Sequence, residues 1–338
     1  MQLFVDFNSF DQQYLLEGVS KGISFFLLGL CITPYPVCPR SKAEYPFYVA
    51  QRNELSINGN FNLSLDSNKE ILMALNFCSL SSGSSGNCYY LGNEFHGILI
   101  DAGISATAIR KFLKSMDISM QSIMGVLITH NHIDHIKGLG VLTRKNNLPA
   151  FTTQKVWESI LTQEKKISID CIRKIPLQQN FNLAGFDIEA FPVCHDAPET
   201  IGFHICYGDK RITIVTDLGH ICETSAPYMK SANLLVIESN YDEQMLVDGR
   251  YPNFLKKRIQ SDNGHLGNHQ ASVFLADIIN DNLCHICLAH LSKNNNTPEK
   301  ALQTLQQTFS ERGINLNSQQ SISILNRNTP TGIIRLAE

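Results

Sequence analysis

The chain has little of what ties a protein to a membrane. Its conspicuous apolar run, residues 22–32, covers eleven positions, whereas a helix needs about 20 apolar residues to cross a bilayer. The segment before that run carries three acidic residues against one lysine, so the basic start of a signal peptide is missing. We therefore expect a cytoplasmic protein without stable membrane association.

The sequence also lacks a strong charge and a disulfide framework. Its net charge of -3 gives no general attraction to nucleic acid, so any such contact must come from a local basic patch. Ten cysteines are scattered along the chain, which predicts reduced thiols. The spacing Cys284–Cys287 matches C-x-x-C, but it lies in an apolar run and favours a buried strand over a metal site.

The first 72 residues differ from the rest. A clean strand pattern opens only at Met73, and the 43% of apolar residues predicts a sizeable core. We expect residues 73–338 to form the catalytic domain. Residues 1–72 are expected to be an N-terminal extension that is poorly ordered or outside that domain, or else upstream sequence translated with it.

The most informative stretch is 130–135, where three histidines and one aspartate follow an apolar run. Such a cluster adds nothing to core stability. Imidazole nitrogens and a carboxylate held within a few residues of one another are what a divalent metal ion requires.

Other apolar runs also end in residues that can bind metal or transfer protons. Short runs rich in β-branched residues are typical of strands buried inside layered sheets, and sites in α/β folds gather where such strands end. Helical patterns alternate with the runs, which predicts an α/β fold with at least two sheets. The terminal residues are Asp101, His130, His195, Asp217, Glu238 and His290.

With these motifs in this order, the chain resembles the metallo-β-lactamase superfamily from about Met73 to its C-terminus. The resemblance implies an αβ/βα sandwich of two mixed sheets flanked by helices. Three shorter segments resemble the WalJ/YycJ-like group, whose members are compared with DNA exonucleases. These segments are Cys78–Asn87, Gly264–Asn268 and Ala289–Asn295.

The resemblance implies two divalent metal ions, with zinc as the default and manganese as the alternative. One ion would be held by His130, His132 and His195. The second would be held by Asp134, His135 and His290, with Asp217 bridging the two ions. Asp101 would not bind metal and would orient a ligand.

The same resemblance implies a mechanism for phosphodiester hydrolysis. A hydroxide bridging the ions would be the nucleophile. A protonated His265 paired with Glu238 would donate a proton to the leaving group. Asp134 would be catalytic because it is a metal ligand. The alternative is that Glu238 caps a loop and His265 lies at the surface.

Two segments are candidates for substrate contact. The run Lys256, Lys257 and Arg258 is the densest basic stretch of the domain and could neutralise phosphates, or it could be a solvated charged face. The Ser/Gly stretch containing Ser85 and Asn87 could offer backbone N–H groups to a phosphate, or it could be a plain hairpin turn.

The favoured interpretation is a dinuclear phosphodiesterase that acts on nucleic acid, with DNA as substrate and exonuclease-like action. The first alternative is a thioester, lactone or β-lactam hydrolase of the same fold. Acyl chemistry of that kind does not require Glu238, His265 or the basic run. The second alternative is a metal-binding module without catalysis, which has no reason to keep an open two-metal centre.

Overall fold

The computed structural model describes residues 25–27, 30–34, 48–52, 74–164 and 166–336. The chain divides into two compact units, Met1–Asn68 and Lys69–Glu338. In the first unit the structure describes a three-stranded antiparallel sheet. Its strands are β1 (Phe25–Leu27), β2 (Leu30–Pro34) and β3 (Tyr48–Arg52). The expectation of poor order in residues 1–72 falls mostly on residues outside the described ranges.

The second unit contains two sheets of seven strands each. In one sheet, β17, β4, β5 and β6 are antiparallel, and β6 to β9 continue in parallel. In the other, β10 to β13 are antiparallel and β13 to β16 are parallel. Both sheets are therefore mixed, as expected. The strands of the first sheet are β17 (Ile334–Leu336), β4 (Leu75–Ser81), β5 (Cys88–Gly92), β6 (Gly97–Ile100), β7 (Ile123–Leu127), β8 (Ala150–Thr152) and β9 (Ile172–Lys174). Those of the second are β10 (Asn180–Leu183), β11 (Phe186–Val193), β12 (Thr200–Tyr207), β13 (Lys210–Val215), β14 (Leu234–Glu238), β15 (His285–Ala289) and β16 (Ser321–Ile324).

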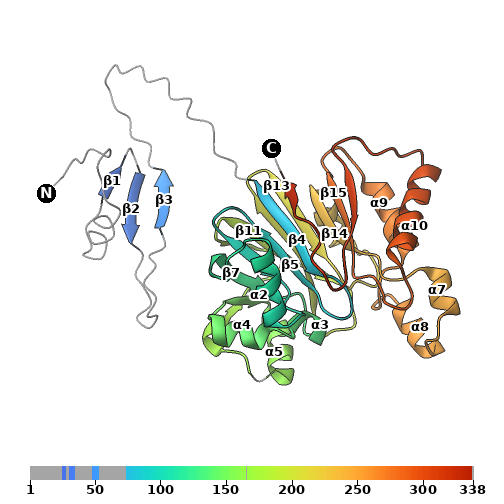
Figure 1. Cartoon of the computed structure of the whole chain (residues 1–338), viewed down its shortest axis with the longest axis horizontal. Helices are drawn as coiled ribbons and strands as arrows, with labels where there is room; N and C mark the ends of the chain where they lie inside the picture. Colours follow the sequence, from blue (N-terminus) through green and yellow to red (C-terminus); the bar gives the residue numbers. More distant parts are fainter. Residues whose placement is uncertain (1–24, 28–29, 35–47, 53–73, 165, 337–338) are drawn as a thin grey trace, which may run out of the picture. The chain divides into compact units, whose positions relative to one another are not determined.

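Helices cover the outer faces of both sheets. Figure 1 shows α2, α4 and α5 on one flank of the strands and α9 and α10 on the other. One apolar cluster fills the space between the sheets. Each sheet has one further cluster between its outer face and its helices. The helices are α2 (Ala106–Ser115), α3 (Ile133–Ile136), α4 (Leu139–Asn146), α5 (Gln154–Gln163), α6 (Ala226–Lys230), α7 (Glu243–Asp248), α8 (Asn253–Ile259), α9 (Asn268–Ile278) and α10 (Pro298–Glu311).

The apolar periodicity explains these layers. Strand β14 is buried along its whole length, because a parallel strand inside a two-sheet sandwich is covered on both faces. Helix α2 buries only Ala106, Ile109 and Leu113, a spacing of three and four residues that forms one stripe. The C-x-x-C run lies mostly in strand β15, as expected: Cys287 is buried within the strand, and Cys284 directly precedes it and is half-buried.

Candidate metal centre

The candidate ligands lie at one edge of the sandwich, where the parallel strands of both sheets end. Asp101 follows β6, Asp217 follows β13 and His290 follows β15. The carboxyl ends of parallel strands meet at the same edge of a sheet. Two sheets packed face to face therefore bring residues that are far apart in the sequence into one site.

Three of these residues have an unusual backbone. Asp101, Asp217 and His290 have φ values of 60°, 57° and 53°, in the left-handed region that residues other than glycine rarely adopt. A turn of this kind at the strand end changes the direction of the chain. Backbone strain of this sort is kept where surrounding structure enforces it, and it concentrates at functional sites.

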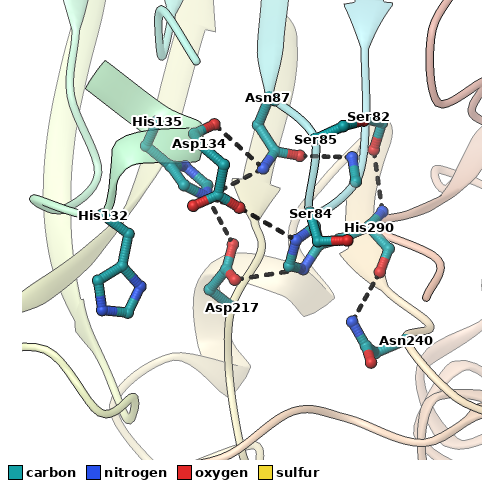
Figure 2. Close-up of polar contacts among 12 residues, drawn as sticks. Ser82, Ser84, Ser85, Asn87, His132, Asp134, His135, Asp217, Asn240 and His290 are labelled. Atoms are coloured by element: carbon teal, nitrogen blue, oxygen red, sulfur yellow. Dashed lines mark hydrogen bonds and ion pairs between the residues drawn. The ribbon is translucent and has the colours of Figure 1, made fainter. Parts of the chain in front are cut away.

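The predicted ligands come together in three sets of donor atoms, the third of which overlaps the first two. One set consists of His130, His132 and His195. The second consists of Asp134, His135 and His290. Asp217 joins a third set with His130 and His135, which places its carboxylate between the other two. The close-up shows four side chains facing a common space: Asp134, His135, Asp217 and His290 (Figure 2).

Four of the histidines each make a hydrogen bond to the protein through their Nδ1 atom. The Nδ1 atom of His135 lies 2.7 Å from Asp101 Oδ2, and that of His290 lies 2.6 Å from Glu238 Oε1. The Nδ1 atom of His195 lies 3.0 Å from the carbonyl oxygen of Gly264. These acceptors place the proton on Nδ1 and leave a lone pair on Nε2. His130 follows the same rule, because its Nδ1 lies 3.0 Å from the Thr129 hydroxyl.

Four inward-facing atoms of the site make no hydrogen bond of suitable geometry. Within the described part of the chain these buried atoms are Nε2 of His130, His195 and His290 and Oδ2 of Asp217. Charged neighbours lie close to two of them: Asp196 Oδ1 is 3.2 Å from His195 Nε2, and His135 Nε2 is 3.1 Å from Asp217 Oδ2. Burying such atoms without a partner costs about 1–3 kcal/mol each. Imidazole and carboxylate donors that converge on one space fit divalent metal ions, which would satisfy all four atoms.

The electrostatics of the centre also favour cations. Burial lowers the pKa of His290, but Asp217 and the contacts with Asp134 and Glu238 outweigh burial and raise it to about 10. Burial opposes ionisation of Asp217, yet the charges of His290 and His135 bring its pKa well below the usual range. The carboxylates thus hold positive charge in a buried space, and a metal ion that binds there displaces protons.

Glu238 has a larger role than the sequence indicated. It is fully buried, and its Oε1 accepts from His265 Nδ1 at 2.9 Å and from His290 Nδ1 at 2.6 Å. Its Oε2 accepts the backbone N–H groups of Leu218 and Leu266. Burial raises the pKa of Glu238, but the contacts with His265 and His290 outweigh it and lower the pKa to about 2. One carboxylate therefore positions both the predicted proton donor and a predicted metal ligand.

Asp101 lies behind His135. Besides His135, its carboxylate accepts the backbone N–H of Thr129 at 2.9 Å and the hydroxyl of the same residue. It is fully buried, and burial raises its pKa against the opposing effect of His135. These contacts fit the prediction that Asp101 orients a ligand.

The histidine motif is partly helical. Helix α3 begins directly after His132, so Asp134 and His135 lie on a helical turn. The turn directs both side chains toward the second donor set, whereas His130 and His132 precede it and join the first set.

The predicted substrate residues divide into two groups. Lys256, Lys257 and Arg258 lie in the last turn of helix α8, and Arg258 lines a cavity beside the metal centre. Ser85 is exposed in the turn between β4 and β5 and contacts Asn328. Asn87 is buried, and its amide lies 2.9 Å from His135 Nε2. This position suits Asn87 to hold the ligand loop and not to contact substrate.

Asp196 is a site residue that the sequence analysis missed. Its Oδ1 lies 3.2 Å from His195 Nε2 and 3.9 Å from His132 Nε2, and its Oδ2 binds the guanidinium of Arg258. Its place directly after His195 was the available signal. The ion pair with Arg258, which lies far along the chain, carries no signal in a single sequence.

In the part of the chain that the structure describes, no helix is both long and apolar enough to span a bilayer.

The fold and the site together define a class of protein. The family described as "Beta-lactamase superfamily domain" matches residues 96–286. The chain belongs to the metallo-β-lactamase superfamily and is a metal-dependent hydrolase of that superfamily. It is 36% identical to exodeoxyribonuclease YycJ of Bacillus anthracis over 269 residues, which are 77% of this chain and 99% of that protein. It is 34% identical to exodeoxyribonuclease WalJ of Streptococcus pneumoniae over 228 residues, 67% of this chain and 85% of that protein.

Solved structures share the fold at low sequence identity. The metallo-β-lactamase fold protein YhfI from Bacillus subtilis is similar with a TM-score of 0.59 and 15% identity, covering 78% of this chain and 99% of that one. Human tRNase Z, short form, is similar with a TM-score of 0.52 and 14% identity, covering 76% and 98%. The predicted sandwich of two mixed sheets with flanking helices is confirmed.

Proposed function

We propose that this protein is a two-metal phosphodiesterase that digests DNA from an end. The observation that carries the proposal is the Glu238–His265 pair beside the metal centre. His265 gives one ring nitrogen to Glu238, and its side chain is about a quarter exposed at 24% and lines the adjoining cavity. A positioned acid of this kind is what a poor alkoxide leaving group requires.

The residues that would hold the two ions are those predicted from the sequence. His130, His132 and His195 would hold one ion, and Asp217 would lie between this ion and the second. The second would be held by Asp134, His135 and His290. Bound there, the ions would supply Lewis-acid activation of the phosphoryl oxygen and of the attacking water. Zinc fits this donor chemistry best, with manganese as the alternative.

His265 then serves as the proton donor. Burial lowers its pKa, but the neighbouring Glu238 carboxylate outweighs burial and raises it. The raised pKa favours the protonated ring that a proton donor needs, and Nδ1 of this ring is held by Glu238. The donor can reach the leaving oxygen of a substrate placed between the cavity and the metal centre.

The choice of DNA is supported by the relatives, which are named exodeoxyribonucleases. The alternative within the same fold is hydrolysis of a thioester, lactone or β-lactam. A thioester has no use for an acid built from a buried carboxylate and a histidine, because a thiolate leaves without being protonated.

A substrate panel tests the proposal. The metal-loaded protein is incubated with end-labelled single- and double-stranded DNA and RNA, and in parallel with thioester, lactone and β-lactam substrates. We expect mononucleotides to be released progressively from one end of DNA, with no comparable acyl hydrolysis. Acyl turnover without cleavage of any nucleic acid would overturn the proposal, and internal cuts would replace the exonuclease assignment with an endonuclease one.

A further inference from the structure

A cavity of about 190 Å³ opens directly beside the metal centre. One side is formed by His265 and His290, the predicted proton donor and a predicted metal ligand. The other side is formed by the segment from Tyr251 to Ile259, which includes helix α8. Its volume is below the roughly 300–1,000 Å³ of pockets that enclose a whole small ligand. The cavity is therefore suited to one end of a larger substrate.

The lining of the cavity includes an aromatic and an apolar side chain. These are Tyr251 and Leu255, and Tyr251 is only partly exposed. The Nδ2 atom of Asn294 donates to the Tyr251 hydroxyl at 3.0 Å. This bond occupies the hydroxyl, and the ring of Tyr251 is the part that could meet a base. Bases of single strands stack on aromatic side chains in proteins that bind them.

The rim of the cavity carries one fixed cation. The guanidinium of Arg258 binds Asp196 through two nitrogens, with Nε at 2.6 Å from Oδ2. The other oxygen of Asp196 lies 3.2 Å from His195 Nε2. Arg258 is therefore anchored at the edge of the metal centre. A guanidinium has five N–H donors, and the Nη1 donors remain for a phosphate.

We propose that this cavity is the subsite for the terminal nucleoside of a DNA strand. The base stacks on Tyr251, and Arg258 contacts the phosphate that joins the terminal nucleoside to the rest of the strand. Seated in this way, the strand presents that phosphate to the metal centre and its leaving oxygen to His265. The inference rests on the proposed function and specifies which part of the substrate the protein recognises.

The test compares Tyr251→Ala, Tyr251→Phe and a matched control, Phe254→Ala. Phe254 is an aromatic residue of helix α8, three positions after Tyr251, that is 75% exposed and is not among the residues that line the cavity. Each protein digests two single strands, one with a normal terminal nucleotide and one whose terminal nucleotide lacks its base. Stacking contributes about 1–3 kcal/mol per base, so we expect KM on the normal strand to rise about 10-fold in Tyr251→Ala. Tyr251→Phe and Phe254→Ala should behave as wild type.

The strand without the terminal base separates stacking from a structural role. Wild type should already show the raised KM on it, and Tyr251→Ala should add nothing further. If Tyr251→Ala impairs both strands equally, the ring has only a structural role and the proposal fails. An unchanged KM on the normal strand would also refute it.

A binding measurement keeps the result independent of catalysis. A strand with a terminal 2-aminopurine and an uncleavable terminal linkage is titrated with the metal-loaded proteins. Stacking on Tyr251 should quench the fluorescence in wild type and Tyr251→Phe and not in Tyr251→Ala. Absence of quenching in wild type would overturn the subsite even if DNA is digested. If no DNA is cleaved but quenching occurs, the proposed function fails and the subsite stands.

Discussion

At the scale of single residues, the predicted proton donor and the predicted metal ligands have separable roles. His265 contacts Glu238 through Nδ1 and joins a donor set only together with Glu238. We expect His265→Ala to lower kcat on DNA by about 10²–10⁴-fold while the bound metal stays unchanged. Single-turnover cleavage and elemental analysis of the same samples measure both quantities. His269→Ala, an exposed histidine of helix α9, is the control, and loss of metal in His265→Ala would reassign His265 as a ligand.

Glu238 connects the two roles, and this connection gives a pH prediction. Its carboxylate raises the pKa of His265 against the opposing effect of burial. Activity that needs protonated His265 is present below that raised pKa and falls as the pH rises through it. Glu238→Gln removes the charge, so the basic limb of the kcat profile should move to lower pH. Weaker metal binding is also expected, because His290 loses its charged acceptor.

A pH profile of Glu238→Gln at saturating metal measures the shift apart from metal loss. The His265→Ala protein serves as the comparison, since its profile should lack the basic limb that depends on His265. An unchanged basic limb in Glu238→Gln would show that Glu238 does not set the protonation of His265.

Substitution of Asp101 tests whether a buried carboxylate that contacts a predicted metal ligand, His135, controls metal affinity. Asn fits the left-handed backbone at this position, so Asp101→Asn changes charge with little change of shape. Partners of this kind typically contribute 10–100-fold to metal affinity, and we expect a loss in that range by competition with a chromophoric chelator. Asp170→Asn, at an exposed position, should bind metal as wild type does. Equal affinity in Asp101→Asn would contradict the orienting role.

At the scale of elements, close backbone packing holds helix α3 against the loop after β6. A Cβ atom added at Gly103 would lie 1.6 Å from the carbonyl oxygen of Asp134 and 2.5 Å from the backbone nitrogen of Asn87. Both neighbours are backbone and cannot rotate away. We expect Gly103→Ala to cost about 1–3 kcal/mol of unfolding free energy and to weaken metal binding, because α3 carries Asp134 and His135.

Thermal unfolding with and without metal measures both effects of Gly103→Ala. Gly332→Ala is the matched control, since nothing lies within 4 Å of a Cβ added there. A Gly103→Ala protein that melts and binds metal as wild type does would show that the contact is not needed to position α3.

The helices and strands also show which structural features can be predicted from a single sequence. The strand ends and the alternation of strands with helices follow from apolar periodicity, which is a local property, and so the edge of the sandwich could be predicted. The turn of α3 could not, because a four-residue helix has no periodicity to detect. The left-handed residues at the strand ends are likewise set by the surrounding structure, since nothing in Asp217 or His290 alone requires that conformation.

At the scale of the whole molecule, the motifs sufficed for the fold and the candidate ligands, because their order along the chain is specific. The contacts between distant segments had no local signal. The Asp196–Arg258 pair joins residues 62 positions apart, and Glu238 meets His290 across 52 positions. Asn87 was expected at the substrate, but the packing of the β4–β5 turn on α3 places its amide against His135.

The central claim is that this buried centre holds two metal ions and hydrolyses DNA from an end. Single-turnover digestion of end-labelled single-stranded DNA, with the metal-free protein titrated with zinc or manganese, tests it most directly. We predict that mononucleotides are released from one end and that the rate reaches its maximum only at about two ions per chain. A maximal rate with one ion, or no cleavage with two ions bound, would contradict the account.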